Sequence, residues 1–102
     1  MVSVNEVHTQ LSALGERLRT TRLERNETMA QFARRIGVSV ATLRGMETGE
    51  STVQIGYWAN ALWALGRLDE LRTMLAPHGD LISRARLAQQ PLRRRARPRL
   101  PG

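Results

Sequence analysis

Apolar residues recur at helical intervals along most of the chain, and they nowhere alternate with period two over the length of a strand. The first such stretch covers residues 5–25, and Asn26 follows it as a plausible stop. Its apolar side chains share one face of the predicted helix: Val7, Leu11, Leu14 and Leu18. The pattern therefore predicts a first helix that buries one side.

A second helix is predicted to begin beside Thr28. Thr28 and Gln31 lie three residues apart, which is the spacing of a capping box, and the apolar pattern runs on to about Ile36. Its inward residues are Met29, Phe32, Ala33 and Ile36. Ser39 then caps a third helix, from about Val40 to 46 or 48, which Gly49 ends.

The two short helices are joined by a turn at Gly37. Small Ala33 stands four residues before it, and Val38, Leu43 and Met46 follow at helical intervals. A helix-turn-helix needs small residues where its helices cross, a glycine at the turn and apolar anchors behind the exposed helix. The stretch 29–49 therefore points to a protein that holds a helix in the major groove of DNA.

Two further helices and a tail complete the expected organisation. A fourth helix covers about 54–65, with an inward stripe of Ile55, Trp58, Leu62 and Leu65. A fifth runs over about 68–75, where Pro77 prevents continuation. We expect an all-α domain over residues 1–79, with its core in 11–76. The stretch 80–90 forms at most a weak helix, and 80–102 is expected to be a largely disordered Arg/Pro-rich tail.

The positive charge of the chain lies at its end. All 16 basic residues are Arg, and the formal net charge is +7. Residues 1–80 hold nine Arg and all nine acidic residues, so the seven Arg after Asp80 carry the whole excess. Guanidinium groups suit bidentate contact with phosphate, although an Arg-only set is equally expected of a GC-rich genome.

Composition excludes several classes of function. There is no Cys, which rules out disulfides and Cys-based metal sites or nucleophiles. No apolar run approaches the ~20 residues of a membrane span, and the N-terminus lacks the pattern of a secretory signal. His8 and His78 have no partner motif, and no triad, phosphate loop or carboxylate pair is apparent. We expect a cytoplasmic, nucleoid-associated protein that is not an enzyme and uses neither metal nor cofactor.

The stretch LGERLRTTRLERNETMAQFARRIGVSVATLRGMETGE resembles the five-helix, lambda-repressor-like DNA-binding domain of the XRE (Cro/C1-type) family. The resemblance covers about Leu14 to Leu75 and implies a partly buried ion pair of Arg22 with Glu47. The following VQIGYWANALWALGRLDELRTMLAP, with the Arg- and Pro-rich end, looks like HipB-type antitoxins. It implies an autoregulating repressor that binds a HipA-like kinase toxin. A phage or stand-alone XRE regulator, or a protein-interaction module with weak DNA readout, is the alternative.

Contacts to DNA are expected along one surface of the second and third helices. The residues assigned to it are Thr28, Arg34, Arg35, Ser39, Val40, Ala41, Arg44 and Thr48. Arg44 is the one long polar side chain on the outer side of the third helix, where it can take the O6 and N7 of a guanine. Val40 and Ala41 suit thymine methyl groups. Met29 stands where the family usually has Gln.

A two-fold dimer on palindromic DNA is expected, because one helix reads few base pairs. Tyr57, Trp63 and Leu71 are candidates for the dimer seam or for a toxin-binding patch; Trp58 is better placed in the core. Arg93, Arg94, Arg95 and Arg97 are candidates for nonspecific phosphate contacts. The tail can instead dock on an acidic partner or simply be solvated.

Overall fold

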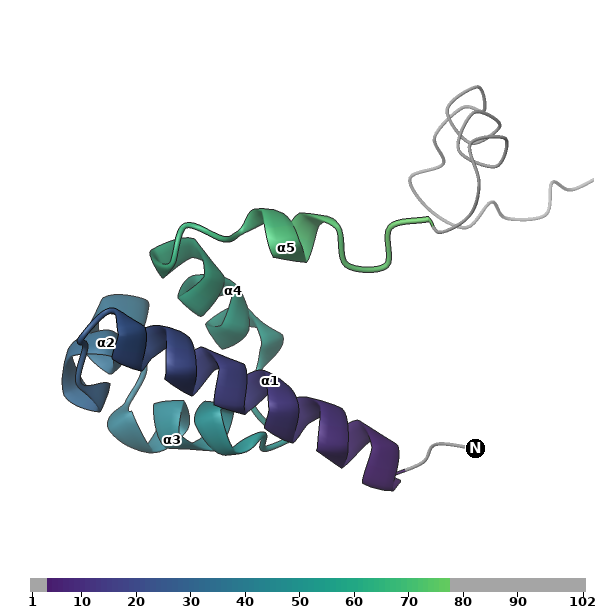
Figure 1. The fold of residues 1–102 in the computed structure, drawn as a ribbon, viewed down its shortest axis with the longest axis horizontal. Helices are drawn as coiled ribbons and strands as arrows, with labels where there is room; N and C mark the ends of the chain where they lie inside the picture. Colours follow the sequence, from purple (N-terminus) through teal and green to yellow (C-terminus); the bar gives the residue numbers. More distant parts are fainter. Residues whose placement is uncertain (1–3, 78–102) are drawn as a thin grey trace, which may run out of the picture. The chain divides into compact units, whose positions relative to one another are not determined.

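The computed structural model describes residues 4–77, and this part of the chain is helical, with no strand. The helices are α1 (Val4–Glu24), α2 (Met29–Ile36), α3 (Val40–Thr48), α4 (Ile55–Ala64) and α5 (Asp69–Arg72). The chain divides into two units at Arg72, and α1 to α5 belong to the first (Figure 1). Of the second unit, residues 73–77 are described; they form a turn in which Leu75 is fully exposed. The predicted tail, the stretch 80–90 and His78 lie outside the described residues.

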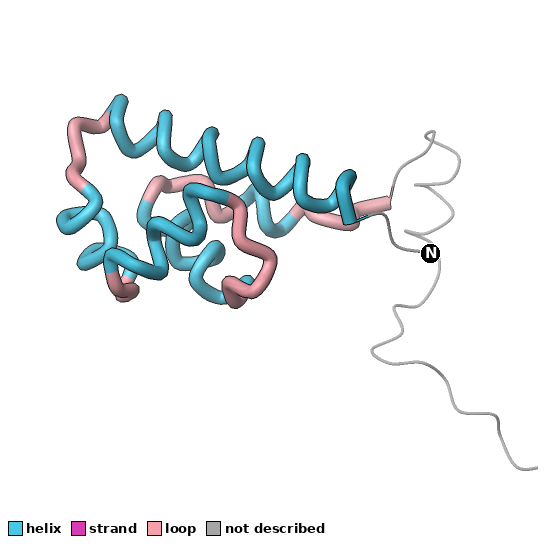
Figure 2. Tube along the Cα trace, turned by 90° about the horizontal axis from the view of Figure 1, so that it is seen from below, coloured by secondary structure: helices cyan, strands magenta, loops and turns pink. Residues whose placement is uncertain are grey.

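α1 is the longest helix and lies along α3 (Figure 2). Two glycines permit the close approach. A Cβ on Gly15 would stand 2.4 Å from the carbonyl oxygen of Met46, and a Cβ on Gly49 would stand 2.5 Å from the backbone nitrogen of Ser12. Because these neighbours are backbone atoms, no side-chain movement would make room for a larger residue.

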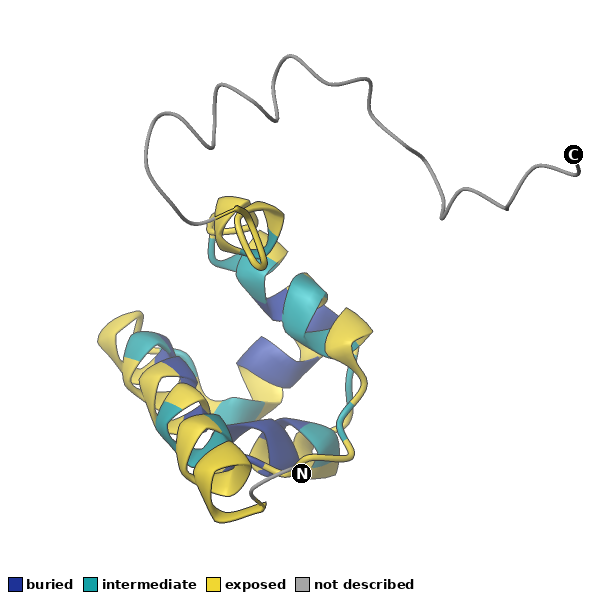
Figure 3. Ribbon diagram, turned by 90° about the vertical axis from the view of Figure 1, so that its right-hand side faces the viewer, coloured by how far each residue is buried: buried dark blue, intermediate teal, exposed yellow. Residues whose placement is uncertain are grey.

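The core lies between α2 and α3, and α1 and α4 close it from two sides. In Figure 3 the buried segments of these helices face one another. The buried apolar residues of the described range are Leu18, Phe32, Ala33, Ile36, Leu43, Met46 and Ala61. Phe32, Leu43 and Met46 are completely inaccessible to solvent. The inward residues predicted for α2 and α3 are thus confirmed, except that Met29 is half-buried.

The helix boundaries follow the local signals in the sequence. Asn26, two residues after α1, has a positive φ of 57°. Thr28 and Gln31 form the complete capping box, since each side chain accepts a hydrogen bond from the other residue's backbone N–H, at 3.1 and 2.9 Å. Ser39 caps α3 by accepting a bond from Thr42 N at 3.0 Å. These predictions are confirmed.

Three predictions about burial and length are wrong. Leu14 and Val7 of α1 are 36% and 45% exposed, and Ile55 of α4 is 63% exposed. Periodicity gives the side of a helix that carries apolar residues, but it does not say how far the neighbouring helix extends along that side. α5 spans Asp69–Arg72 instead of 68–75, because it has no buried residue and a helix this short depends on tertiary packing.

Candidate nucleic-acid interface

The turn between α2 and α3 fixes how α3 is presented. Gly37 adopts the left-handed conformation with a φ of 75°, which costs glycine little. Its N–H and that of Val38 then bond back to the last carbonyls of α2, at 3.3 Å to Arg34 and 3.0 Å to Ala33. Ser39 caps α3 directly after Val38, so the turn between α2 and α3 consists of residues 37–39 alone. Only three residues therefore separate α3 from the end of α2.

α3 has one buried and one exposed side. Leu43 and Met46 are 0% exposed and anchor it to the core. The outer side carries residues that are all exposed, namely Ser39, Val40, Ala41, Arg44 and Thr48. The N-terminal part of this side carries one hydroxyl and two small apolar side chains, and the guanidinium of Arg44 follows one helical turn later. Such a surface offers apolar contact plus one strong hydrogen-bonding group.

Two hydroxyls on this side are already used within α3. Ser39 Oγ accepts from Thr42 N and donates to Thr42 Oγ1, both at 3.0 Å. Thr48 Oγ1 donates to the carbonyl oxygen of Arg44 at 2.9 Å. Both hydroxyls therefore already form hydrogen bonds within the protein. This leaves Arg44 as the main polar group of the outer side that is available to a ligand.

The N-terminus of α2 belongs to the same predicted DNA-contacting surface. The first backbone N–H groups of a helix have no hydrogen-bond partner within the helix, so they are available to an anion. Thr28 is exposed and holds the capping box, whereas Met29 is half-buried and packs against the core. Met29, in the position where the family usually has a polar residue, therefore contributes to packing. An anion at this helix end would be bound by backbone N–H groups and the helix dipole.

The arginines of α2 differ in their surroundings. Arg34 is exposed, and neither it nor Arg44 forms an ion pair or side-chain hydrogen bond with any residue between 4 and 77. Arg35, in contrast, pairs with Glu27, donates to the carbonyl oxygen of Ala64 and lies 5.8 Å from the centre of the Phe32 ring. Arg35 thus links α2 to the end of α4. Its predicted phosphate contact would require giving up these bonds.

Behind this surface lies a buried ion pair. Arg22 Nε and Nη2 donate to the two carboxylate oxygens of Glu47, at 2.7 and 3.1 Å, and Nη1 donates to the carbonyl oxygen of Glu27 at 2.8 Å. Both side chains are about 95% buried. The hydrogen bond to Glu47 raises the pKa of the Arg22 guanidinium above its ordinary value, against a smaller lowering by burial. The pair joins α1 to the C-terminal end of α3.

Sequence reasoning missed Gly15, where α1 and α3 approach closely, and it treats Gly45 only as a residue that weakens the third helix. Gly15 and Gly45 are both buried on helices, but only Gly15 is pressed against backbone. A glycine inside an apolar helical pattern signals either a weak point or a close approach, and the chain alone does not decide between them. Ala61 was missed as well; it is completely buried where α4 meets the core.

The residues predicted for a dimer or partner interface do not share one environment. Trp63 is 71% exposed, whereas Tyr57 and Leu71 are half-buried, and Tyr57 packs against the core. Trp58 also packs on the core, as expected. The tail arginines Arg93, Arg94, Arg95 and Arg97 lie outside the described residues.

The comparison with protein families identifies the domain. A family model described as "Helix-turn-helix domain" matches residues 13–75, more than half of the chain. The chain belongs to the helix-turn-helix domain family, in its XRE-like form. Neither curated proteins nor solved structures gave a significant match. Since helix-turn-helix domains bind DNA, membership indicates a DNA-binding regulator.

The described part of this helix-turn-helix protein was also searched for metal sites and for membrane-spanning helices. Within residues 4–77, no group of three or more His, Asp or Glu side chains is arranged to hold a metal ion. None of the described helices combines the length and apolar character needed to cross a membrane.

Proposed function

We propose that the protein is a transcriptional repressor that places α3 in the major groove of its operator. One observation carries the proposal: Leu43 and Met46 fix one side of α3 in the core, while Arg44 stands exposed and unpaired with residues 4–77 on the other. Major-groove readout requires an exposed helix that is anchored to the core and carries an available hydrogen-bonding group such as a guanidinium.

Each exposed group has a defined task in this proposal. Arg44 takes the O6 and N7 of a guanine, while Val40 and Ala41 contact thymine methyl groups. Thr28 and the first N–H groups of α2 hold a phosphate, and Arg34 adds charge along the backbone. Ser39 and Thr48 border the contact while keeping their internal hydrogen bonds. Arg35 joins only if a phosphate replaces Glu27.

The protein binds as a homodimer in this proposal, because α3 alone reads too few base pairs. A two-fold pair presents two recognition helices one helical turn, ~34 Å, apart and reads a palindrome. Exposed Trp63 marks the side of the molecule where a second chain is expected, with Tyr57 and Leu71 nearby in sequence. With DNA as its target, the protein is placed at the nucleoid and acts without cofactor or catalysis.

The finer role we infer is that of a HipB-like antitoxin, which represses its own promoter and holds a HipA-like kinase toxin. The support is the resemblance of the stretch 53–77 to such antitoxins, together with an exposed Trp available to a partner. A stand-alone XRE regulator is the alternative. Co-purification with the product of an adjacent kinase-like gene supports the antitoxin role, and the absence of such a gene argues against it.

The test of DNA readout compares Arg44→Ala with Arg19→Ala on the DNA upstream of the gene. Arg19 is exposed on α1 and has no side-chain partner among residues 4–77, so its loss removes the same charge elsewhere. A bidentate Arg–guanine contact discriminates by ~1–3 kcal/mol, so Arg44→Ala should weaken specific binding by roughly 5- to 150-fold. Arg19→Ala should change it little. Equal affinity of the wild type for upstream and random DNA would refute sequence-specific repression.

A further inference from the structure

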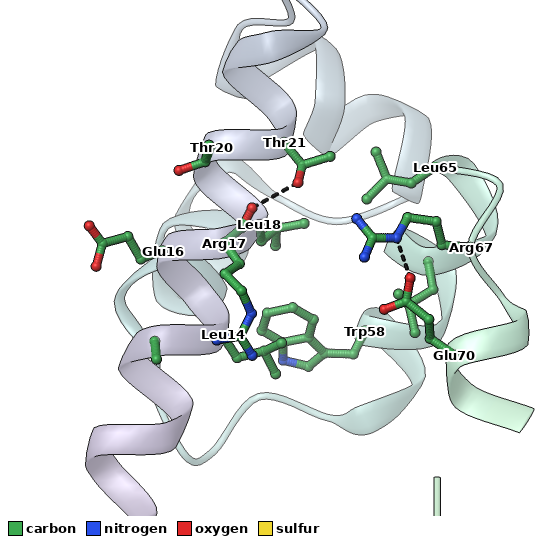
Figure 4. A pocket seen from close by; sticks show the side chains of 12 residues that line it. Leu14, Glu16, Arg17, Leu18, Thr20, Thr21, Trp58, Leu65, Arg67 and Glu70 are labelled. Atoms are coloured by element: carbon green, nitrogen blue, oxygen red, sulfur yellow. Dashed lines mark hydrogen bonds and ion pairs between the residues drawn. The ribbon is translucent and has the colours of Figure 1, made fainter. Parts of the chain in front are cut away.

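A groove lies between α1 on one side and α4 and α5 on the other (Figure 4). Its lining residues belong to the first unit of the chain, and the large apolar ones among them are Leu14, Leu18, Trp58, Leu62 and Leu65. Of these, Leu18 is buried, whereas the other four keep part of their surface open to solvent, and Leu14 is 36% exposed. The helices within residues 4–77 therefore leave an apolar recess uncovered here.

The dimensions of the groove suit a small molecule. Its volume is about 560 Å³, and ligand pockets in proteins typically hold ~300–1,000 Å³. A standard protein–protein interface takes ~20–30 residues from each partner, whereas 12 residues line this groove. Ligand pockets are mostly apolar and contain a few polar groups that orient the ligand. The polar groups of this groove therefore indicate the class of its ligand.

Two guanidinium groups border the apolar lining. Arg17 extends from α1, and Arg67 extends from the loop after α4 (Figure 4). Arg67 is paired with Glu70 of α5, which also lines the groove. Glu16 is a lining residue as well, but its carboxylate points away from the groove. The groove therefore holds two cations and one carboxylate, and it carries an excess positive charge.

Two hydrogen-bond donors of the groove are available to a ligand. Arg17 forms no ion pair or side-chain hydrogen bond with any residue between 4 and 77. The indole N–H of Trp58 has no partner among these residues either, and it is not cut off from solvent. A ligand that covers the indole ring must supply an acceptor for this N–H, because a covered Trp N–H normally finds a partner.

We propose that the groove binds an apolar monocarboxylate. Its hydrocarbon part lies against Trp58 and Leu62, where it removes apolar surface from water, and Arg17 holds its carboxylate as a planar bidentate pair. A cationic ligand would meet the like charges of Arg17 and Arg67, and a neutral one would leave Arg17 unmatched. No residue of α3 lines the groove, so this site is separate from the proposed DNA contact and does not depend on it.

Calorimetric titration with octanoate, without DNA, tests the proposal. Octanol and octylammonium carry the same hydrocarbon chain with no charge and with a positive charge. We expect saturable binding of octanoate, with an affinity at least about tenfold above that of octanol, and no binding of octylammonium. Arg17→Gln should weaken octanoate binding at least about fivefold and leave octanol binding unchanged. Arg19→Gln removes the same charge from α1 outside the groove and should bind octanoate like the wild type.

A second measurement locates the ligand. The chain has two Trp residues, and Trp63 does not line the groove. Each gives its own indole N–H signal in a nitrogen–proton correlation spectrum, and Trp63→Phe identifies them by removing one. Octanoate should shift the signal of Trp58 and leave that of Trp63 in place.

Four results would overturn the proposal: no saturable octanoate binding, octanol binding as tight as octanoate binding, an unchanged octanoate affinity in Arg17→Gln, or an unshifted indole signal of Trp58. Because no DNA is present, each of these outcomes leaves the DNA-binding proposal to its own test.

Discussion

The Arg22–Glu47 pair shows how single residues define this domain. A buried bidentate pair is specific in geometry, and each partner depends on the other for its charge to be tolerated. Because the pKa of Arg22 is raised in the folded state, the ion pair contributes fully to the free energy of unfolding at any pH below the ordinary pKa of arginine. This contribution is lost only in strong alkali. Between pH 5 and 9 Arg22 therefore introduces no pH dependence of stability.

Glu47→Gln should destabilise the domain strongly. It leaves the Arg22 charge buried without its counter-charge, for which a loss of ~3–5 kcal/mol in the free energy of unfolding is expected. Arg67→Gln, which breaks the exposed pair of Arg67 with Glu70, should leave the free energy of unfolding nearly unchanged, because solvent screens this pair. Urea denaturation of both variants measures the difference. Equal midpoints for Glu47→Gln and the wild type would show that the pair is not needed for stability.

Residue-level expectations succeeded where the cause is local. The capping box at Thr28 and the turn glycine Gly37 depend on neighbours within a few positions, and both are as predicted. Arg35 is predicted to contact DNA because it lies on the exposed side of the second helix, and this stays a prediction. In the structure it also pairs with Glu27 and donates to the carbonyl oxygen of Ala64, two partners that lie outside its own helix. Long-range pairing of this kind leaves no mark in the periodicity.

At the scale of helices, the sequence predicts which faces are apolar but not how closely helices approach. Gly15 and Gly45 look alike in the chain, each a glycine within a helix. The structure separates them: backbone of α3 stands against Gly15, whereas at Gly45 the nearest atoms belong to the exposed, flexible side chain of Glu50. The stripe predicted through Ile55 is wrong for a related reason, since none of the helices within residues 4–77 covers Ile55, which is 63% exposed.

Replacement by alanine should therefore change the free energy of unfolding in opposite directions at Gly45 and at Gly15. Gly45→Ala should raise the free energy of unfolding by up to ~1 kcal/mol, because alanine favours the helix and Glu50 can swing away. Gly15→Ala should lower it, because its new Cβ would lie 2.4 Å from a carbonyl oxygen of α3. Thermal unfolding of the two variants gives the signs. A loss of stability in both would mean that Glu50 is held in place.

For the whole molecule, charge is divided between the domain and the tail. Residues 1–80 are neutral in sum, and seven Arg follow Asp80. Within the domain, the segment 28–46 still holds three Arg and no acid. The domain is thus expected to select the DNA sequence, while the tail adds affinity without sequence choice.

Truncation after Asp80 tests this division. If the tail arginines neutralise phosphates, each contact contributes ~0.9 to the slope of log affinity against log salt concentration, so the truncated chain should show a shallower slope. The preference for operator over random DNA should persist. Filter binding over a range of salt concentrations measures both quantities. An unchanged slope would assign the tail to a protein partner or to solvent.

Methylation interference on the bound operator tests the central claim, that α3 enters the major groove, most directly. Methylation of guanine N7 blocks the major-groove edge, and methylation of adenine N3 blocks the minor groove. We predict interference at a guanine N7 in each of two half-sites about one helical turn apart, and its loss in Arg44→Ala. Interference confined to adenine N3, or a guanine signal that Arg44→Ala leaves unchanged, would contradict the account.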